Sequence, residues 1–369
     1  METAKLHQTE KSKTSTQSIE IKLNNKSLIN FFNPDYFEFS SHSERVNPVW
    51  DTENSTLSLQ VGKIYQKLEE KISGFLRMED TLLYSNSFDS NGGIFESLLT
   101  EKDAVICDEL SYNSVTEGIR LNKAVHYQYR NNNIKDLEYQ LQYACSQDYR
   151  FKIIVTDGVF SLDGSVANLS EICNLAEKYK AWVVVDDSHA LGFMGETGRG
   201  TPECCHVLDK IDIVAVSFGE SKGGFVSGKK EIINVLRKNP RSYLSVNSST
   251  LKRAEATSKI FDTFTETPNY GKKVLKNADY FRKKMKSAGF DLVGEDTAIM
   301  SVMLYDAQLA QDFADKLRND GIYALGFSCP VVPAGKARIR IQISALHTQE
   351  QLDEAAHVFA KIGKEFGVI

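Results

Sequence analysis

Short runs of apolar, mostly β-branched residues alternate with segments of helical periodicity through the middle of this chain. Buried strands are indicated by FKIIVTDG, AWVVVDDS and DIVAVSF, and helices by LSEICNLAEKYK and KEIINVLRK. Continuous apolar strands separated by helices are typical of a mainly parallel sheet that is covered on both faces. We therefore predict an α/β fold, with the central sheet in a large domain over residues 46–265.

Both ends of the chain differ from this pattern. Longer helices and few strands after the large domain predict a smaller C-terminal α+β domain over residues 266–369, with TETPNYGKK (265–273) as the linker. Near the start, IEIKLNNKSLINFF predicts a hairpin that turns at Asn24 and Asn25, within an N-terminal segment of residues 19–45. Residues 1–18 are polar and predict a disordered tail.

Composition narrows the classes of function. The 369 residues are 41% hydrophobic with a formal net charge of −5, which disfavours a general nucleic-acid or anionic-membrane binder. No apolar run approaches the roughly 20 residues that span a bilayer, and the first residues lack the apolar core of a secretory signal. The six cysteines form no C-x-x-C pair, so we expect reduced thiols, no metal site and a cytoplasmic location.

One strand end carries an acid, a histidine and a glycine-rich loop. In VVVDDSHALGFMGETGRG, Asp186 ends an apolar strand and His189 follows three residues later. Ligands of open α/β sheets bind at the carboxyl ends of the strands, so these residues are candidates for a binding pocket. Taken alone, these residues favour a structural cap and a hydrogen-bonded turn histidine over a binding site.

Two further strand ends strengthen the pocket interpretation. In TDGVFSLDGSVANL, Ser161 follows the end of another predicted strand. In YSNSFDSNGGIFESLL, a helix led by glycines is predicted to follow Asn86, Ser87 and Phe88. A helix N-terminus with free N–H groups binds anions, so we predict a polar pocket with a phosphate site.

Several long motifs, in a consistent order, resemble the α-oxoamine synthase family of enzymes that depend on pyridoxal 5′-phosphate (PLP). The resemblance runs from about residue 19 to the end and includes TDGVFSLDGSVANL, VVVDDSHALGFMGETGRG, AGKARIRIQISALHT and IGKEFGVI. It implies PLP-dependent fold type I and a homodimer with active sites at the subunit interface. The most similar members join glycine and acetyl-CoA into 2-amino-3-ketobutyrate and CoA, or run the reverse reaction in threonine breakdown.

The resemblance also implies roles for individual residues. Asp186 would pair with the pyridine nitrogen of PLP, while His189 and Ser161 would bind its phenolic oxygen. Tyr112 occupies the position of a histidine that stacks on the ring, and Arg340 that of the arginine that holds the amino-acid carboxylate. The phosphate would be bound by Asn86, Ser87, Phe88 and Ser217. Arg338, two residues before Arg340, is predicted to lie on the surface.

The chain departs from the family at the lysine that forms the Schiff base with PLP. Glu220 occupies that position, Lys222 follows two residues later, and roughly four residues of the next glycine-rich stretch are missing. In one interpretation Lys222 takes the Schiff-base role and acts as the general base. In the other the chain is a catalytically silent partner or regulatory subunit, paired in a heterodimer with an active paralogue. Pocket positions also differ at Asp35, Leu57 and Val246, where the family has Asn, Arg and Ser.

Overall fold

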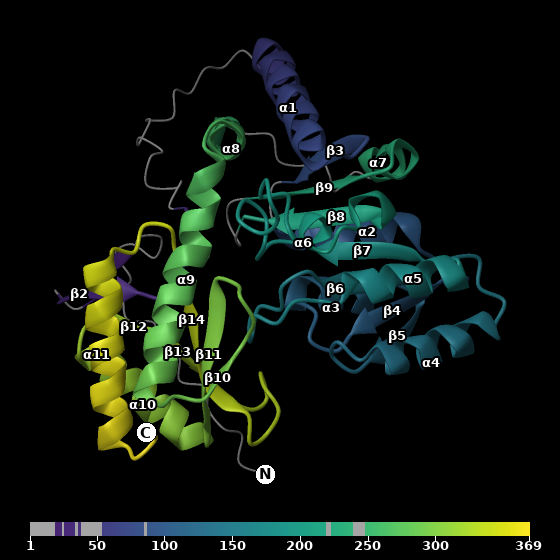
Figure 1. The fold of residues 1–369 in the computed structure, drawn as a ribbon. Helices are drawn as coiled ribbons and strands as arrows, with labels where there is room; N and C mark the ends of the chain where they lie inside the picture. Colours follow the sequence, from purple (N-terminus) through teal and green to yellow (C-terminus); the bar gives the residue numbers. More distant parts are fainter. Residues whose placement is uncertain are drawn as a thin grey trace.

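The computed structural model describes residues 19–23, 26–33, 36–37, 54–84, 87–218, 223–238 and 248–369. Figure 1 shows two lobes, a larger one in blue and teal and a smaller one in green and yellow. The predicted disordered tail and the predicted turn at Asn24 and Asn25 lie outside the described residues. Within the described ranges, no helix combines the length and apolarity needed to cross a membrane.

The large lobe is built on a seven-stranded sheet in the order β3-β9-β8-β7-β6-β4-β5. Its strands are β3 (Asp80–Tyr84), β4 (Ala104–Asp108), β5 (Val125–Tyr129), β6 (Lys152–Asp157), β7 (Trp182–Asp186), β8 (Ile213–Ser217) and β9 (Gly224–Gly228). Within this sheet β9 runs antiparallel to both of its neighbours, and the other pairings are parallel. The predicted mainly parallel sheet is therefore confirmed.

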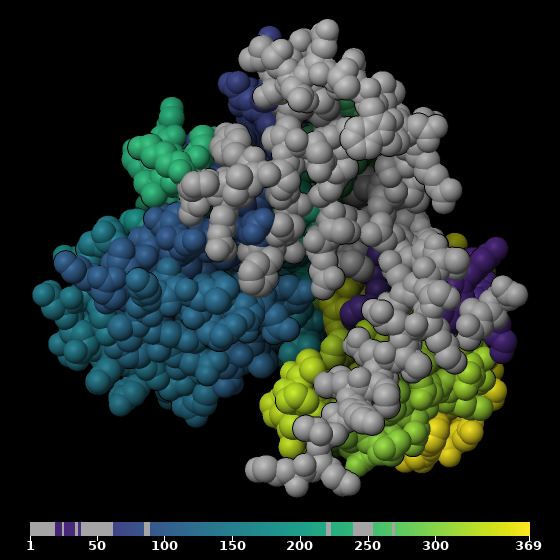
Figure 2. All heavy atoms as spheres, turned by 180° about the vertical axis from the view of Figure 1, so that it is seen from behind, coloured from purple at the N-terminus to yellow at the C-terminus, as the bar shows by residue number. Residues whose placement is uncertain are grey.

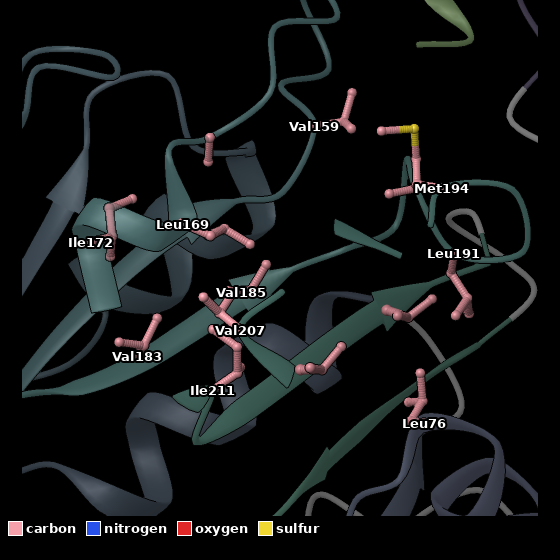
Figure 3. Close-up of a cluster of buried hydrophobic side chains, with 14 of the residues drawn as sticks. Leu76, Val159, Leu169, Ile172, Val183, Val185, Leu191, Met194, Val207 and Ile211 are labelled. Atoms are coloured by element: carbon pink, nitrogen blue, oxygen red, sulfur yellow. The ribbon is translucent and has the colours of Figure 1, made fainter. Parts of the chain in front are cut away.

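Helices cover both faces of this sheet. They are α1 (Asn54–Leu76), α2 (Ser87–Leu98), α3 (Asn113–Arg120), α4 (Ile134–Cys145), α5 (Leu169–Tyr179), α6 (Thr201–Cys204), α7 (Lys230–Arg237) and α8 (Ser248–Glu266), with a short 3-10 turn at Leu208–Lys210. Figure 3 shows Val183 and Val185 of β7 beside Leu169 and Ile172 of α5 in one apolar cluster. Val184, between them, belongs to a second cluster on the other face. Burial on both faces explains why these strands are continuously apolar.

The start of α2 differs from the prediction. The helix begins at Ser87, so Gly92 and Gly93 lie inside it rather than at its start. A Cβ atom added to Gly118 of α3 would lie 2.8 Å from the Cα atom of Gly92. These two glycines therefore allow α2 and α3 to pack closely, which accounts for a glycine inside the helix despite its cost to helix stability.

The small lobe contains a four-stranded sheet in the order β10-β11-β14-β13. Its elements are α9 (Pro268–Ala288), β10 (Leu292–Val293), β11 (Ile299–Tyr305), α10 (Ala307–Asn319), β12 (Ile322–Tyr323), β13 (Leu325–Phe327), β14 (Ala337–Gln342) and α11 (Gln349–Glu365). The proposed linker spans the junction of two helices, since α8 ends at Glu266 and α9 begins at Pro268. One apolar cluster joins α9, α10 and α11 to β11 and β14.

The N-terminal hairpin belongs spatially to the small lobe. The strands β1 (Glu20–Leu23) and β2 (Lys26–Asn30) are antiparallel, as predicted, and β2 pairs in parallel with β12. In Figure 2 the purple atoms of this hairpin lie beside the green and yellow atoms of the small lobe. The first described elements of the chain thus pack against elements about 300 residues later.

His347 connects this hairpin to the small lobe through hydrogen bonds and ring stacking. Its Nδ1 accepts the amide hydrogen of Ser344 at 2.9 Å, which leaves Nε2 to donate to the carbonyl of Asn30 at 3.2 Å. Its ring stacks on Phe31 with centroids 4.7 Å apart. Burial lowers the pKa of His347 to about 4, because it disfavours the charged imidazolium.

Stability should therefore depend on pH through His347. Below about pH 6.5 the unfolded chain binds a proton at this residue, whereas the folded chain does so only near pH 4, so stability is lost as pH falls. We expect the free energy of unfolding to fall by about 2 kcal/mol more for the unmodified protein than for His347→Asn between pH 7 and 4.5. Urea unfolding at both pH values measures this difference.

The exposed His357 provides the control. His357→Asn should keep the pH dependence of the unmodified protein. An equal fall in the free energy of unfolding for His347→Asn and the unmodified protein would show that the buried imidazole does not contribute to the pH dependence of stability.

Candidate active site

The carboxyl ends of the central parallel strands bring three elements of the candidate site to one edge of the large sheet. Asp157, at the end of β6, pairs in register with Asp186, at the end of β7. Asp186 in turn pairs with Ala215 of β8, two residues before Ser217. This edge is where ligands bind in open α/β sheets, as the strand-end motifs predict.

Asp186 is buried and surrounded by hydrogen-bond donors. Its Oδ2 accepts from the side-chain amide of Asn91 at 2.9 Å, and its Oδ1 accepts from the amide of Ser188 at 3.1 Å and from the Ser188 hydroxyl. Asn91 also donates to the Ser114 hydroxyl at 2.8 Å, which connects the carboxylate to α2 and α3. Burial raises the pKa of Asp186, and the donors from Ser188 and Asn91 oppose that rise.

Asp157 differs from Asp186 in its partners. It is buried and accepts the Tyr112 amide hydrogen at 3.1 Å. Burial raises the pKa of Asp157 well above its usual range, and the neighbouring Asp186 raises it further. Because Asp186 has more donors, we infer that Asp186 is the ionised member of the pair and that Asp157 carries the proton.

His189 lies in the turn after β7, beside two tyrosines. Its Nδ1 is 2.9 Å from the hydroxyl of Tyr36, and its ring lies edge-on to Tyr112 with centroids 6.4 Å apart. Burial and the nearby Arg340 guanidinium lower the pKa of His189 to about 3. The imidazole is therefore neutral near pH 7, with one proton that occupies either ring nitrogen.

Arg340 brings a cation from the small lobe to this edge. It lies on β14, is only 6% exposed, and its Nε donates to the carbonyl of Ser161. Its guanidinium carbon lies 5.2 Å from the centroid of the Phe32 ring. Burial lowers the pKa of Arg340, and the Coulombic influence of Tyr36 and Tyr112 opposes that shift. Among the described residues, none of the recorded ion pairs involves this guanidinium.

Arg338 corrects the prediction of a surface residue. It is 7% exposed and forms an ion pair with Asp163 at 3.7 Å between Nη1 and Oδ2. Asp163 lies in the segment after β6, which covers this part of β14. The sequence places Arg338 near a strand end, but it does not reveal the covering segment.

The structure brings together six of the predicted site residues: Tyr112, Ser161, Asp186, His189, Ser217 and Arg340. Ser217 joins the group through its amide, which donates to Ser188 Oγ at 2.8 Å. Ser87 and Phe88 lie in the first turn of α2, and their side chains are outside the description. Also outside the described residues are Asn86, Glu220, Lys222, Asp35 and Val246, together with the side chain of Leu57.

Four residues of the site escaped the sequence-based prediction: Tyr36, Asn91, Asp157 and Ser188. Asp157 could have been found, because it ends an apolar strand just as Asp186 does. Ser188 follows Asp186 by two residues, a spacing typical of a local carboxylate-to-amide hydrogen bond. Nothing local identifies Tyr36 or Asn91, since each contact joins distant parts of the chain.

Comparisons with known proteins agree with this fold. The model of the class I and II aminotransferase family matches residues 51–359. The chain is 46% identical to 2-amino-3-ketobutyrate coenzyme A ligase of Escherichia coli (strain K12) over 309 residues, which are 83% of this chain and 78% of that protein. The Salmonella typhimurium protein of the same name is 42% identical over 369 residues, 96% of this chain and 93% of that protein.

Solved structures extend the agreement to three dimensions. Serine palmitoyltransferase from S. paucimobilis, with bound PLP-myriocin aldimine, matches with a TM-score of 0.83 and 25% identity, over 97% of this chain and 94% of that chain. The chain therefore belongs to the class I and II aminotransferase family. Within it, the chain is similar to the 2-amino-3-ketobutyrate coenzyme A ligases along most of its length.

The Asn91–Asp186 hydrogen bond can be tested by a double-mutant cycle. We expect Asn91→Leu and Asp186→Asn to be coupled by about 1–3 kcal/mol in the free energy of unfolding, because a buried ionised acceptor loses a donor. The coupling should be larger at pH 8 than at pH 4, where protonation of Asp186 weakens the bond. Urea unfolding of the four proteins at both pH values measures it.

Asp187 supplies the matched control. It is also buried, but its carboxylate accepts from Thr201 rather than from Asn91. A cycle between Asn91→Leu and Asp187→Asn should give a coupling below about 0.5 kcal/mol. Equal coupling in both cycles would argue against a specific role for the Asn91 amide.

Proposed function

We propose that this protein is a PLP-dependent acyltransferase that joins glycine and acetyl-CoA into 2-amino-3-ketobutyrate and CoA, or catalyses the reverse reaction. The observation that carries the proposal is the buried Arg340 guanidinium, which donates to the Ser161 carbonyl and, in addition to burial, lowers the pKa of the His189 imidazole. Among the described residues no carboxylate forms an ion pair with this guanidinium, and a buried cation of this kind suits an anionic ligand such as an amino acid. Relatives that are 39–46% identical carry the corresponding enzyme name.

The chemistry of the donor set fits PLP. The Asp186 carboxylate would accept a hydrogen bond from the pyridine N–H, and His189 with Ser161 would bind the phenolic oxygen. The N-terminus of α2, at Ser87 and Phe88, would supply N–H groups to the phosphate together with Asn86 and Ser217. The aromatic ring of Tyr112 would stack on the pyridine ring. PLP, once bound, withdraws electrons from the α-carbon of the amino acid.

The chain's own residues would perform the remaining tasks. Arg340 would orient glycine through its carboxylate, and the Lys222 amine would take the proton from the α-carbon. The net reaction joins this carbon to the acetyl carbonyl carbon and releases CoA, whose sulfur leaves from that carbonyl. The buried Asp186 would stay ionised because Asn91 and Ser188 donate to it.

The hairpin between β8 and β9 supports Lys222 as the covalent lysine. Ser217 pairs with Gly224, and the amide of Phe218 donates to the carbonyl of Gly223 at 3.0 Å. The described part of the hairpin thus includes Gly223 at the strand ends, and Lys222 is the residue directly before Gly223 in the sequence. The hairpin is also tied to the Asp186 turn by the Ser217–Ser188 hydrogen bond. The loop of this chain is shorter than that of the family. Its shortening gives a physical reason why the Schiff-base lysine would stand at position 222 instead of position 220.

The alternative, a catalytically silent partner subunit, is not favoured by the comparisons, because the proteins that are similar over most of the chain are named as enzymes.

We further propose that the chain acts as a homodimer in the cytoplasm, on the basis of its likeness to the family. Light scattering after size-exclusion chromatography tests the oligomeric state, and a monomeric mass would contradict it.

The role of Lys222 can be tested with the purified protein and PLP. We expect a visible absorption band that borohydride fixes, with the reduced cofactor mapped to Lys222 by peptide mass spectrometry. Lys222→Ala should lose the band and reduce CoA release from glycine and acetyl-CoA by at least about 10³-fold, because both the covalent link and the base are removed.

Lys229→Ala is the matched control. Lys229 follows the last residue of β9, and its Nζ forms an ion pair with Asp212 Oδ1 at 2.7 Å. Removing its side chain should therefore leave the absorption band and the activity unchanged. Reduced cofactor on another lysine, or full activity of Lys222→Ala, would overturn the assignment of Lys222. Absence of any band or activity in the unmodified protein would overturn the proposed reaction.

A further inference from the structure

Tyr36 is the one buried hydroxyl in contact with the imidazole of His189 among the contacts recorded for the described residues. Its oxygen lies 2.9 Å from His189 Nδ1, and the two rings meet edge-on at 84° with centroids 6.1 Å apart. Tyr36 is only 5% exposed. The contact joins residues 153 positions apart in the sequence, so it depends on the tertiary structure.

Both lobes hold Tyr36 in this place. Its carbonyl accepts the amide hydrogen of Ala345 at 3.0 Å and the hydroxyl hydrogen of Ser344 at 2.8 Å, and both of these residues follow β14 in the small lobe. Its ring packs against Phe193 of the large lobe with centroids 4.8 Å apart. The hydroxyl is therefore held against His189 by contacts that do not involve the imidazole.

The charge states of the two groups limit how they share protons. Burial raises the pKa of Tyr36 above its usual range, with Arg340 opposing the rise, so the phenol keeps its proton. The pKa of His189 is lowered to about 3, so the imidazole has a single proton near pH 7. The contact is therefore either O–H···Nδ1 from the tyrosine or Nδ1–H···O from the histidine.

The first arrangement is chemically better. An imidazole nitrogen with a free lone pair is a stronger acceptor than a phenolic oxygen, and a phenol is a good donor. The hydrogen bond made by one ring nitrogen of a histidine decides the protonation of the other. With Nδ1 as the acceptor, the ring proton lies on Nε2.

We propose that Tyr36 is a positioning residue that holds His189 in the tautomer with its proton on Nε2. In this tautomer the nitrogen on the opposite side of the ring from Tyr36 is a hydrogen-bond donor, as an anionic oxygen at the site requires. The inference deepens the proposed function, since it explains how His189 could bind the phenolic oxygen of PLP. Tyr36 acts through His189 and touches no reacting atom.

Nitrogen-15 NMR of histidine-labelled protein without cofactor tests the tautomer directly. We expect the unmodified protein to show His189 Nδ1 as unprotonated and Nε2 as protonated, with the signals assigned by their loss in His189→Asn. Tyr36→Phe keeps the ring that packs on Phe193 but removes the donor. It should shift the Nδ1 resonance or mix the two tautomers. Tyr280→Phe, which removes a hydroxyl bound to Asp353 far from the site, should change neither signal.

Two outcomes would overturn the proposal. One is a proton on Nδ1 in the unmodified protein, a result that does not depend on any variant folding. The other is a His189 spectrum that is the same in Tyr36→Phe and the unmodified protein. Neither measurement requires PLP, so a failure of the proposed cofactor chemistry is distinguishable from a failure of this inference.

A second readout applies to the protein loaded with PLP. Tyr36→Phe should still form the absorption band, but the pH at which the band changes form should shift relative to the unmodified protein. We expect kcat to fall about tenfold with the KM for glycine changed less than about threefold, which corresponds to the loss of one oriented hydrogen bond. An unchanged band titration and an unchanged kcat would contradict a positioning role, because loss of a merely structural contact moves neither.

Discussion

A carboxylate removed from water must find hydrogen-bond donors, and this requirement organises the edge of the large sheet. Asp186 meets it with Asn91 from α2 and Ser188 from the turn after β7. Ser188 in turn accepts from the amide of Ser217 at the end of β8. One buried charge thereby fixes the relative positions of a helix, a turn and a neighbouring strand. Burial raises the pKa of Asp157, the charge of Asp186 raises it further, and Asp157 in turn accepts the amide hydrogen of Tyr112.

The small lobe completes the site and is attached to it through both backbone and side-chain contacts. Arg340 reaches from β14 to the carbonyl of Ser161, and Ser344 and Ala345 hold the carbonyl of Tyr36. The site therefore contains an acid from the large lobe and a guanidinium from the small lobe. The proposed function divides cofactor and substrate recognition between the lobes, so it requires the two lobes to keep their relative position.

The sequence predicts those parts of the fold whose pattern is set by burial. The strands β6, β7 and β8 are apolar along their length because helices cover both faces, and that pattern is visible without a structure. The strand β5 is harder to predict, because it lies at the edge of the sheet and several of its side chains are exposed. Asp186 and His189 are predictable because strand ends mark ligand sites.

Other features depend on contacts that no local pattern records. Gly92 marks a close helix crossing with Gly118, although in the sequence it reads as the start of a helix. Arg338 is buried because the segment with Asp163 covers it. Tyr36 reaches His189 across 153 positions, and its neighbour Asp35 draws attention first because it is the residue that departs from the family.

The energetics of the candidate site favour a working site over a silent one. The buried charges of Asp186 and Arg340 each cost folding free energy, and neither residue is recorded in an ion pair among the described residues. A core that served stability alone would gain by replacing such groups with apolar ones of similar volume. Buried ionisable groups that have hydrogen-bond donors or aromatic rings beside them, but no ion-pair partner among the described residues, suit the binding of a ligand that carries charges of its own. An amino acid and a phosphorylated pyridine supply charges of that kind, and their binding would offset the cost that these buried charges impose on the fold.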